Sequence, residues 1–124
     1  MKIIQAINKL DALIFNTYTY EDKVDWLSRL DTMVKKQIID NYESDEDIIF
    51  SGYTSETPQD TTLLVPAPYD EMYLRWLEAQ IAYHNGEYDK YNNAIIMFNT
   101  SFDAYAAFYN RNHMPVIRGK RFLF

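Results

Sequence analysis

The chain of 124 residues contains no cysteine, which excludes a disulfide framework, a thiolate nucleophile and a cysteine-based zinc site. Its 12 Lys and Arg stand against 18 Asp and Glu, a net charge of −6, and an acidic surface repels the phosphate backbone of nucleic acids. No apolar run approaches the roughly 20 residues of a membrane span. We therefore expect one soluble domain with a single core, in keeping with a reducing cytoplasm.

The charge is unevenly divided between the body of the chain and its end. Residues 1–110 hold 8 Lys and Arg against 18 Asp and Glu, whereas residues 111–124 hold 4 basic residues and no acidic residue. We divide the chain into a helical domain, residues 1–117, and a basic, aromatic tail, residues 118–124. The tail either docks on an acidic partner, such as another copy of the chain, or is a solvated end. The residues assigned to docking are Arg118, Lys120, Arg121, Phe122 and Phe124.

The first two helices are predicted from apolar residues that recur every three or four positions. The repeating residues of the first helix are Ile3, Ile7, Leu10 and Ile14. They predict a helix over residues 2 to about 14, which we interpret as part of the mature protein and not as a signal peptide. Thr19 followed three residues later by Asp22 is typical of a helix start, although Glu or Gln is the usual second member. A second helix is therefore expected over about residues 20–41.

The middle of the chain, residues 42–68, has the composition of a loop. An acidic turn is followed by an apolar patch and then by Gly, Ser, Thr and Pro. The segments "DIIFSGY" and "TTLLVP" have β-propensity, and whether they pair as a short β-hairpin is left open. A loop of this length inside a compact domain is usually functional or partly disordered.

A third and a fourth helix follow as a hairpin. Pro66 and Pro68 restrict the residues before them to extended conformations, and Pro68 also suits the first turn of a helix, so "VPAPYDE" predicts a rigid helix start. The third helix is expected to extend to about His84, since Gly86 suits the left-handed position that ends helices. The fourth is expected over about residues 87–110. The predicted fold is therefore mainly all-α, a four- to five-helix bundle with a long central loop and the β-hairpin as an open alternative.

The fourth helix carries more apolar surface than one packed face requires. Seven residues form a heptad-type seam: Tyr88, Tyr91, Ile95, Phe98, Phe102, Tyr105 and Tyr109. A second stripe of mostly smaller residues runs beside it: Ala94, Met97, Ser101, Ala104 and Phe108. The third helix shows the same doubling, whereas a surface helix of a monomer needs one apolar face of about 100°.

Two interpretations of the doubled stripes remain open. Either the helix is central and wrapped by the other three, or one stripe faces the core and the other faces a neighbouring subunit. The 11 tyrosines favour the second interpretation modestly, because tyrosine is enriched at interfaces. We therefore predict a homo-oligomer whose interface is drawn from Tyr73, Trp76, Leu77, Tyr83, Tyr88, Tyr91, Phe98, Phe102 and Tyr105.

The sequence offers little that could perform chemistry. The acidic run of Asp45, Glu46 and Asp47 lacks the alternating oxygen ligands, the glycine and the distal glutamate of a calcium loop, so we interpret it as a solvated turn. His84 and His113 are the only histidines, and His84 has no metal-binding partner four residues away on its helix. No phosphate loop, nucleophile elbow or His-Glu-x-x-His pattern occurs. We therefore predict no enzyme, no catalytic residue, no metal site and no cofactor.

Most of the chain resembles a family of phage proteins. The segments "YEDKVDWLSRLDTMVKKQIIDNY", "AYHNGEYDKYNNAI", "YNRNHMP" and, as the most specific part, "VPAPYDEMYLRWLEAQI" are similar to small head–tail connector, or adaptor, proteins of tailed phages and prophages of Gram-positive bacteria. The resemblance implies a helical subunit of a ring between portal and tail, with further copies of itself, the portal and tail-completion proteins as partners. It also implies DNA as passing cargo that is not specifically bound, no membrane contact, and a location in the virion or, during assembly, in the host cytoplasm. The alternative is a small helical adaptor or regulatory module of a prophage that binds one host or phage protein.

Overall fold

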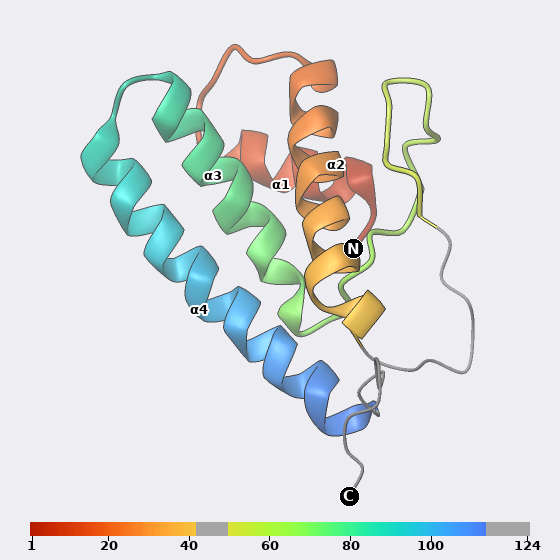
Figure 1. The fold of residues 1–124 in the computed structure, drawn as a ribbon. Coiled ribbons are helices and arrows are strands. Elements are labelled where there is room, and N and C mark those ends of the chain that lie inside the picture. The colour runs from red at the N-terminus through yellow and green to blue at the C-terminus, as the bar shows by residue number, and fades with distance from the viewer. Residues whose placement is uncertain (42–49, 114–124) are drawn as a thin grey trace, which may run out of the picture.

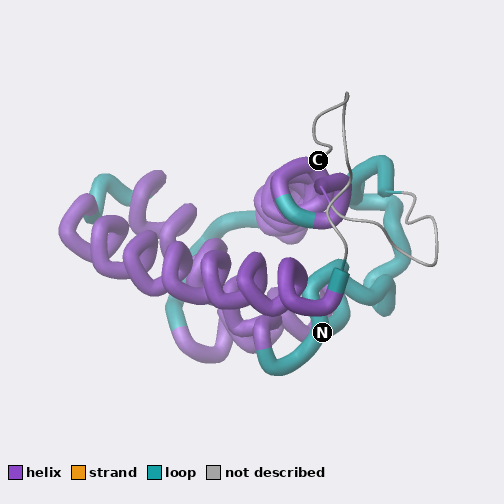
Figure 2. The backbone as a smooth tube through the Cα atoms, turned by 60° about the horizontal axis from the view of Figure 1, so that its bottom comes forward, coloured by secondary structure: helices purple, strands orange, loops and turns teal. Residues whose placement is uncertain are grey.

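The structure is a computed structural model that describes residues 1–41 and 50–113 (Figure 1). Over these ranges it contains four α-helices, α1 (Ile3–Leu13), α2 (Tyr20–Gln37), α3 (Met72–His84) and α4 (Tyr88–Asn112), with two short 3-10 helices, η1 (Ile39–Asn41) and η2 (Tyr69–Glu71). The same ranges hold helix and loop but no strand (Figure 2), so the prediction of a mainly all-α bundle is confirmed. None of the described helices is long and apolar enough to cross a membrane.

α2 begins where the spacing of Thr19 and Asp22 predicted a helix start. The Asp22 backbone N–H donates to Thr19 Oγ1 over 3.1 Å, and the Thr19 N–H donates to Asp22 Oδ2 over 3.4 Å. Aspartate thus completes the reciprocal cap in which Glu or Gln is usual. The helix ends at Gln37, four residues before the predicted end, and the chain tightens into η1.

The turn between α3 and α4 is closed by a glycine. Gly86 has a φ of +76°, the left-handed conformation that glycine adopts without the steric cost of a Cβ atom. At the other end of α3, the segment "VPAPYDE" forms η2 first, and Met72 then begins the α-helix. Pro68 therefore precedes the helical turn, after a cis Ala67–Pro68 peptide bond.

α3 lies at the centre of the bundle and α4 lies on its outside (Figures 1 and 2). α3 packs against α1, α2 and α4, whereas α4 packs mainly against α3 and η2. The helix that its neighbours wrap is therefore α3. The interpretation of the fourth helix as the wrapped one is wrong, because within residues 1–41 and 50–113 no helix packs against its outward side.

The core forms between α1, α2, α3 and the loop that precedes α3. Residues with no exposed surface come from each of these parts and include Ile3, Leu27, Leu30, Val65, Met72 and Leu77. Burying one such aliphatic side chain stabilises a fold by about 1.5–3 kcal/mol. The two interior faces of α1 and α2 that periodicity predicted are thus used to hold α3 in place.

The loop before α3 pairs with the N-terminus of the chain. Thr62 forms an isolated antiparallel bridge with Lys2, the Leu63 N–H donates to the Met1 carbonyl over 2.9 Å, and the Ile3 N–H donates to the Thr61 carbonyl over 3.0 Å. The loop carbonyl of Thr61 therefore satisfies an N–H at the start of α1 that has no partner inside the helix. The β-hairpin between this segment and "DIIFSGY" is absent from the described residues, and residues 47–49 lie outside them.

Candidate protein-binding surface

Four of the nine residues predicted at an interface lie in the core of the chain itself: Tyr73, Leu77, Phe98 and Tyr105. Their side chains are between 0% and 4% exposed and pack within the single hydrophobic core. From Phe98 onward the heptad seam of α4 faces its own chain, because α3 and η2 cover it. We therefore correct the prediction for these four residues and assign them to the core.

A buried carboxylate accounts for the inward position of Tyr73. Asp31 of α2 accepts hydrogen bonds from Tyr53 Oη over 2.5 Å, from Tyr73 Oη over 2.6 Å and from the Leu64 N–H over 3.1 Å. Burial raises the pKa of Asp31, and the three hydrogen bonds oppose that effect. Burial beside Asp31 also raises the pKa of both tyrosine hydroxyls, so they remain protonated donors. Tyr73 Oη in turn accepts from the Val65 N–H over 2.8 Å.

This cluster is a structural joint between α2, the loop and α3. Its carboxylate and hydroxyls bond one another and the backbone, which leaves none of the three side chains directed at a ligand. The sequence carries no local signal for the partners of Asp31. They lie 22, 33 and 42 residues further along the chain, beyond the reach of any local pattern.

Trp76 and Phe102 lie half-buried between the core and the surface. Trp76 Nε1 donates to the Trp26 carbonyl over 2.9 Å, and its ring centroid lies 5.1 Å from that of Phe98. The Phe102 ring lies 5.7 Å from the Phe98 ring. Both side chains are committed mainly to contacts within the chain and offer a partner little additional surface.

The other three predicted residues gather at the turn between α3 and α4, and we call them the tyrosine tip: Tyr83, Tyr88 and Tyr91. Tyr83 and Tyr88 are 52% and 61% exposed, and Tyr91 is half-buried. The ring centroid of Tyr83 lies 6.2 Å from that of Tyr88 and 5.5 Å from that of Tyr91. The fold thus brings three amphipathic rings from two helices onto one accessible surface, as suits a protein contact.

His84, next to the tyrosine tip, packs as an aromatic ring. It stacks on Trp26 at a centroid distance of 5.5 Å and an interplanar angle of 11°. Tyr18 meets the same tryptophan edge-on, and its hydroxyl donates to Asn85 Oδ1 over 2.6 Å. Within the described residues no three His, Cys, Asp or Glu side chains are grouped so that they could hold a metal ion. These contacts join the α3–α4 turn to the start of α2.

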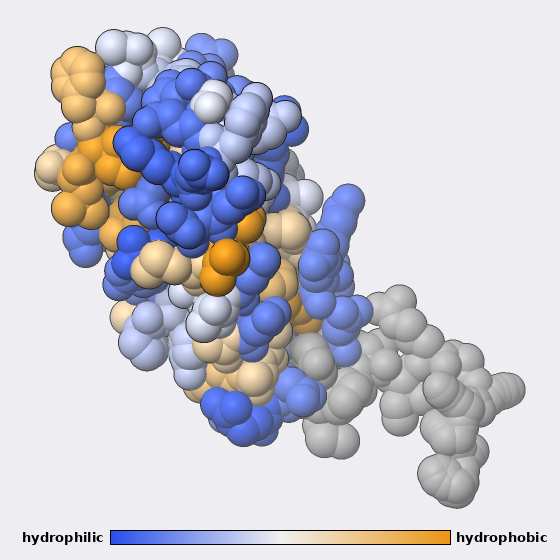
Figure 3. All heavy atoms as spheres, turned by 90° about the vertical axis from the view of Figure 1, so that its left-hand side faces the viewer, coloured by the Kyte–Doolittle hydropathy of each residue, from blue (hydrophilic) through white to orange (hydrophobic). Residues whose placement is uncertain are grey.

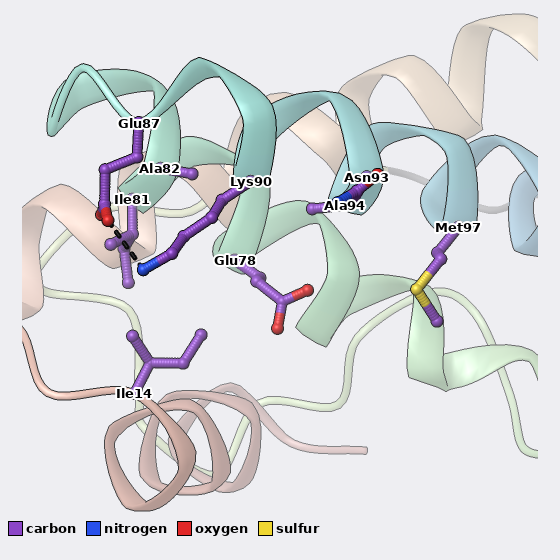
Figure 4. A pocket seen from close by; sticks show the side chains of 9 residues that line it. All are labelled: Ile14, Glu78, Ile81, Ala82, Glu87, Lys90, Asn93, Ala94 and Met97. Atoms are coloured by element: carbon purple, nitrogen blue, oxygen red, sulfur yellow. Dashed lines mark ion pairs between the residues drawn. The ribbon is translucent and has the colours of Figure 1, made fainter.

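A groove of about 310 Å³ opens between α3, the N-terminal half of α4 and the residue that follows α1 (Figure 4). Its lining residues are Ile14, Glu78, Ile81, Ala82, Glu87, Lys90, Asn93, Ala94 and Met97. Two of the lining residues are carboxylates: Glu87 Oε2 is paired with Lys90 Nζ over 2.8 Å, and Glu78 Oε1 lies 3.7 Å from a guanidinium nitrogen of Arg75. The groove is therefore lined mainly by apolar side chains, with two carboxylates and one ammonium group among them.

Large apolar side chains beside the groove residues are left exposed by the bundle. Leu13 and Phe15, on either side of Ile14, are 73% and 91% exposed, and Ile96 and Met97 are 62% and 46% exposed. Figure 3 shows hydrophobic side chains gathered at the upper left of the molecule. We call the groove together with Leu13, Phe15 and Ile96 the apolar face. Exposed apolar side chains around a hollow are typical of an interaction site.

Only part of the apolar face could be predicted from the periodicity of the helices. Met97 belongs to the second stripe of the fourth helix, but Ala94 of that stripe is buried, so the stripe is divided between core and surface. Ile96 belongs to neither stripe, and this off-pattern position was the available signal. Leu13 and Phe15 flank the end of a helix, where periodicity no longer fixes the direction of a side chain.

The fold and the surface together define a small helical bundle with exposed apolar side chains beside a groove. Comparison of the chain with protein-family models, with curated proteins and with solved structures found no match in any of the three. The predicted docking residues of the tail, Arg118, Lys120, Arg121, Phe122 and Phe124, lie outside the described residues, as does the acidic run of residues 45–47.

Proposed function

We propose that the protein is a structural subunit that binds further copies of itself, in an assembly of the phage head–tail connector type. The observation that carries the proposal is the apolar face: Met97 lines the groove, and Leu13, Phe15 and Ile96, each next in the sequence to a lining residue, lie exposed. Full burial of one such side chain contributes about 1.5–3 kcal/mol, which a lone copy does not gain. A partner that covers this face recovers that stabilisation.

The charge of the chain supports a protein partner over nucleic acid. Residues 1–113 hold 9 Lys and Arg against 18 Asp and Glu, a net charge of −9. Such a surface repels phosphate and suits the wall of a channel through which DNA passes without being held. The connector role itself rests on the resemblance of "VPAPYDEMYLRWLEAQI" and its neighbouring segments to that family.

A ring also needs two different contact surfaces on each subunit, because its contacts run head to tail. The tyrosine tip and the apolar face both include residues of α3 and α4, and we assign them together to one of these two contact surfaces. The complementary surface of the next copy must come from another part of the chain.

Electron microscopy of the purified protein, alone and mixed with phage portal and tail-completion proteins, tests the proposal. Rings, alone or on the portal, are the expected result. Discrete monomers that ignore the portal and capture one other protein would overturn the connector role and favour the adaptor alternative.

A further inference from the structure

We propose that the groove binds the C-terminal segment of a second copy, residues 114–124, so that successive copies join head to tail. This inference rests on the self-association proposed above and names the segment that fills the groove. The segment reads "MPVIRGKRFLF": seven of its eleven residues are apolar, three are basic and none is acidic.

The lining of the groove matches the chemistry of that segment. Ile81, Ala82 and Ala94 provide apolar surface between α3 and α4, and Figure 4 shows Ile14 and Met97 directed toward the same space. The volume of about 310 Å³ lies at the lower end of the range for ligand pockets, roughly 300–1,000 Å³. It therefore suits one or two aromatic side chains of a short segment better than a whole helix.

The charges of the groove and the segment are also complementary. Glu78 and Glu87 line the groove, where they can meet Arg118, Lys120 or Arg121 of a bound segment. Lys90 is the one cation that lines the groove in the described part of the chain, and Glu87 already pairs with it. At longer range, a body with a net charge of −9 attracts a segment with a net charge of +3.

A second hollow carries more acidic residues than the groove, so charge attraction alone would favour binding of the segment there. This hollow of about 410 Å³ is lined by Glu21, Asp22 and Asp25 together with Tyr53, Thr54 and Ser55. It holds three carboxylates and no aliphatic side chain, so the phenylalanines of the segment would remain in water there. The combination of aliphatic and acidic lining residues distinguishes the groove of α3 and α4 from this hollow.

The position of the groove favours the tail of a second copy over the tail of the same chain. His113, the last described residue of the body, follows the far end of α4. At 1.5 Å per helical residue it lies about 24 Å from Met97 and about 35 Å from Lys90. Phe122 is nine residues beyond His113 and reaches at most about 31 Å even when fully extended. A contact within one chain would therefore require an almost straight return along α4, whereas a second copy meets no such limit.

Donor and acceptor at opposite ends of α4 have a consequence for assembly. The segment leaves one end of the helix, and the groove lies at the other, so the contact joins two different surfaces. Such a heterologous contact closes into a ring when its rotation allows and otherwise continues as a filament. The C-terminal segment thus provides the second contact surface that a ring requires.

Cysteine cross-linking tests the inference, because the chain has no cysteine of its own. A full-length Met97→Cys chain is mixed with a full-length Phe122→Cys chain and oxidised mildly, and the products are separated by non-reducing electrophoresis. The matched acceptor control is Ser55→Cys, in the more acidic hollow. We expect the linked dimer to form at least about tenfold faster through Met97→Cys than through Ser55→Cys, a ratio that corresponds to about 1.4 kcal/mol.

A second acceptor and a second arrangement make the outcome decisive. Asn93→Cys, also in the groove, should give the same result as Met97→Cys. It serves as the acceptor if Met97→Cys does not fold. A chain that carries both Met97→Cys and Phe122→Cys should yield linked multimers. Equal rates at Ser55→Cys, or an internally closed monomer from the double variant, would overturn the inference. If no cross-link forms although the wild-type chain self-associates, the groove does not bind the C-terminal segment, but the proposed function stands. If neither cross-links nor self-association is seen, the proposed function is overturned as well.

Discussion

The region around Asp31 and the region around the α3–α4 turn use the same residue types in opposite ways. Tyr53 and Tyr73 are buried, and their hydroxyls donate to one carboxylate in the core. Tyr83 and Tyr88 lie exposed, with their rings in contact with each other. The comparison teaches that tyrosine serves two purposes in this chain: two of its copies are fixed in the core by a buried carboxylate, and two others present their rings at the surface.

Removal of the Asp31 carboxylate should have the largest effect on stability. Asp31→Ala is expected to lower the free energy of unfolding by about 3–5 kcal/mol, because the hydroxyls of Tyr53 and Tyr73 and the Leu64 N–H lose their acceptor, and each unpaired buried donor costs about 1–3 kcal/mol. Urea unfolding followed by circular dichroism measures the change. The exposed control Asp60→Ala should stay within about 0.5 kcal/mol of wild type, and a similarly small change for Asp31→Ala would contradict the structural role of this joint.

Two tyrosines of the same helix sharpen the comparison directly. Tyr73→Phe should lower the free energy of unfolding by about 2 kcal/mol, because it removes a donor to Asp31 and leaves the Val65 N–H without its acceptor. Tyr83→Phe removes an exposed hydroxyl and should change that free energy by less than about 0.5 kcal/mol. Equal losses for the two variants in urea unfolding would show that the contrast is wrong.

The raised pKa of Asp31 predicts a dependence of stability on pH. In the folded protein this pKa lies above its ordinary value of 3.8 because burial outweighs the hydrogen bonds, so the folded state holds a proton that the unfolded state releases. The contribution of Asp31 to the free energy of unfolding is fully present below pH 3.8. It is lost as the pH rises through the pKa that Asp31 has in the folded protein. The unfolding free energy of wild type minus that of Asp31→Asn should therefore decrease as the pH rises from 3.8, with a slope of at most about 1.4 kcal/mol per pH unit. A difference that increases with pH would contradict the direction of the shift.

The smallest expected effect compares two ion pairs. Lys23 Nζ lies 2.7 Å from Asp11 Oδ1 with the lysine buried, whereas Arg29 and Asp25 form a pair at 2.9 Å in which both side chains are exposed. Asp11→Asn should cost about 1 kcal/mol, since a buried ammonium loses its partner while solvent screens the half-exposed carboxylate. Asp25→Asn should cost less than about 0.5 kcal/mol. Urea unfolding measures the loss of unfolding free energy in both variants. A larger loss for Asp25→Asn than for Asp11→Asn would contradict the prediction.

The helices could be predicted from the sequence because their signals are local. Apolar residues three and four positions apart located each helix, the pair of Thr19 and Asp22 located the start of α2, and Gly86 located the turn before α4. The least accurate boundary was the end of α2, where the chain continues as the 3-10 turn η1 without a Gly or Pro to mark the change.

Which aromatic side chains point into the core and which lie at the surface could not be predicted from such local signals. Tyr73 and Tyr83 look alike in the sequence, and only the fold brings Asp31, 42 residues earlier, to the hydroxyl of Tyr73. The central position of α3 likewise depends on how the helices pack and not on the stripes of any one helix. The interface prediction therefore included core residues and left out Leu13, Phe15 and Ile96, whose exposure follows from which side of α1 and α4 is covered.

Sedimentation velocity of the full-length chain over a wide concentration range tests self-association through the apolar face most directly. We predict that the sedimentation coefficient of wild type rises with concentration. In the variant with Ile96→Ser and Met97→Ser the rise should require a concentration at least about tenfold higher, which corresponds to about 1.4 kcal/mol. The adjacent exposed pair Lys36→Ser and Gln37→Ser, on α2, should behave as wild type. A wild-type chain that remains monomeric throughout, or an Ile96→Ser, Met97→Ser variant that associates as well as wild type, would contradict the proposal.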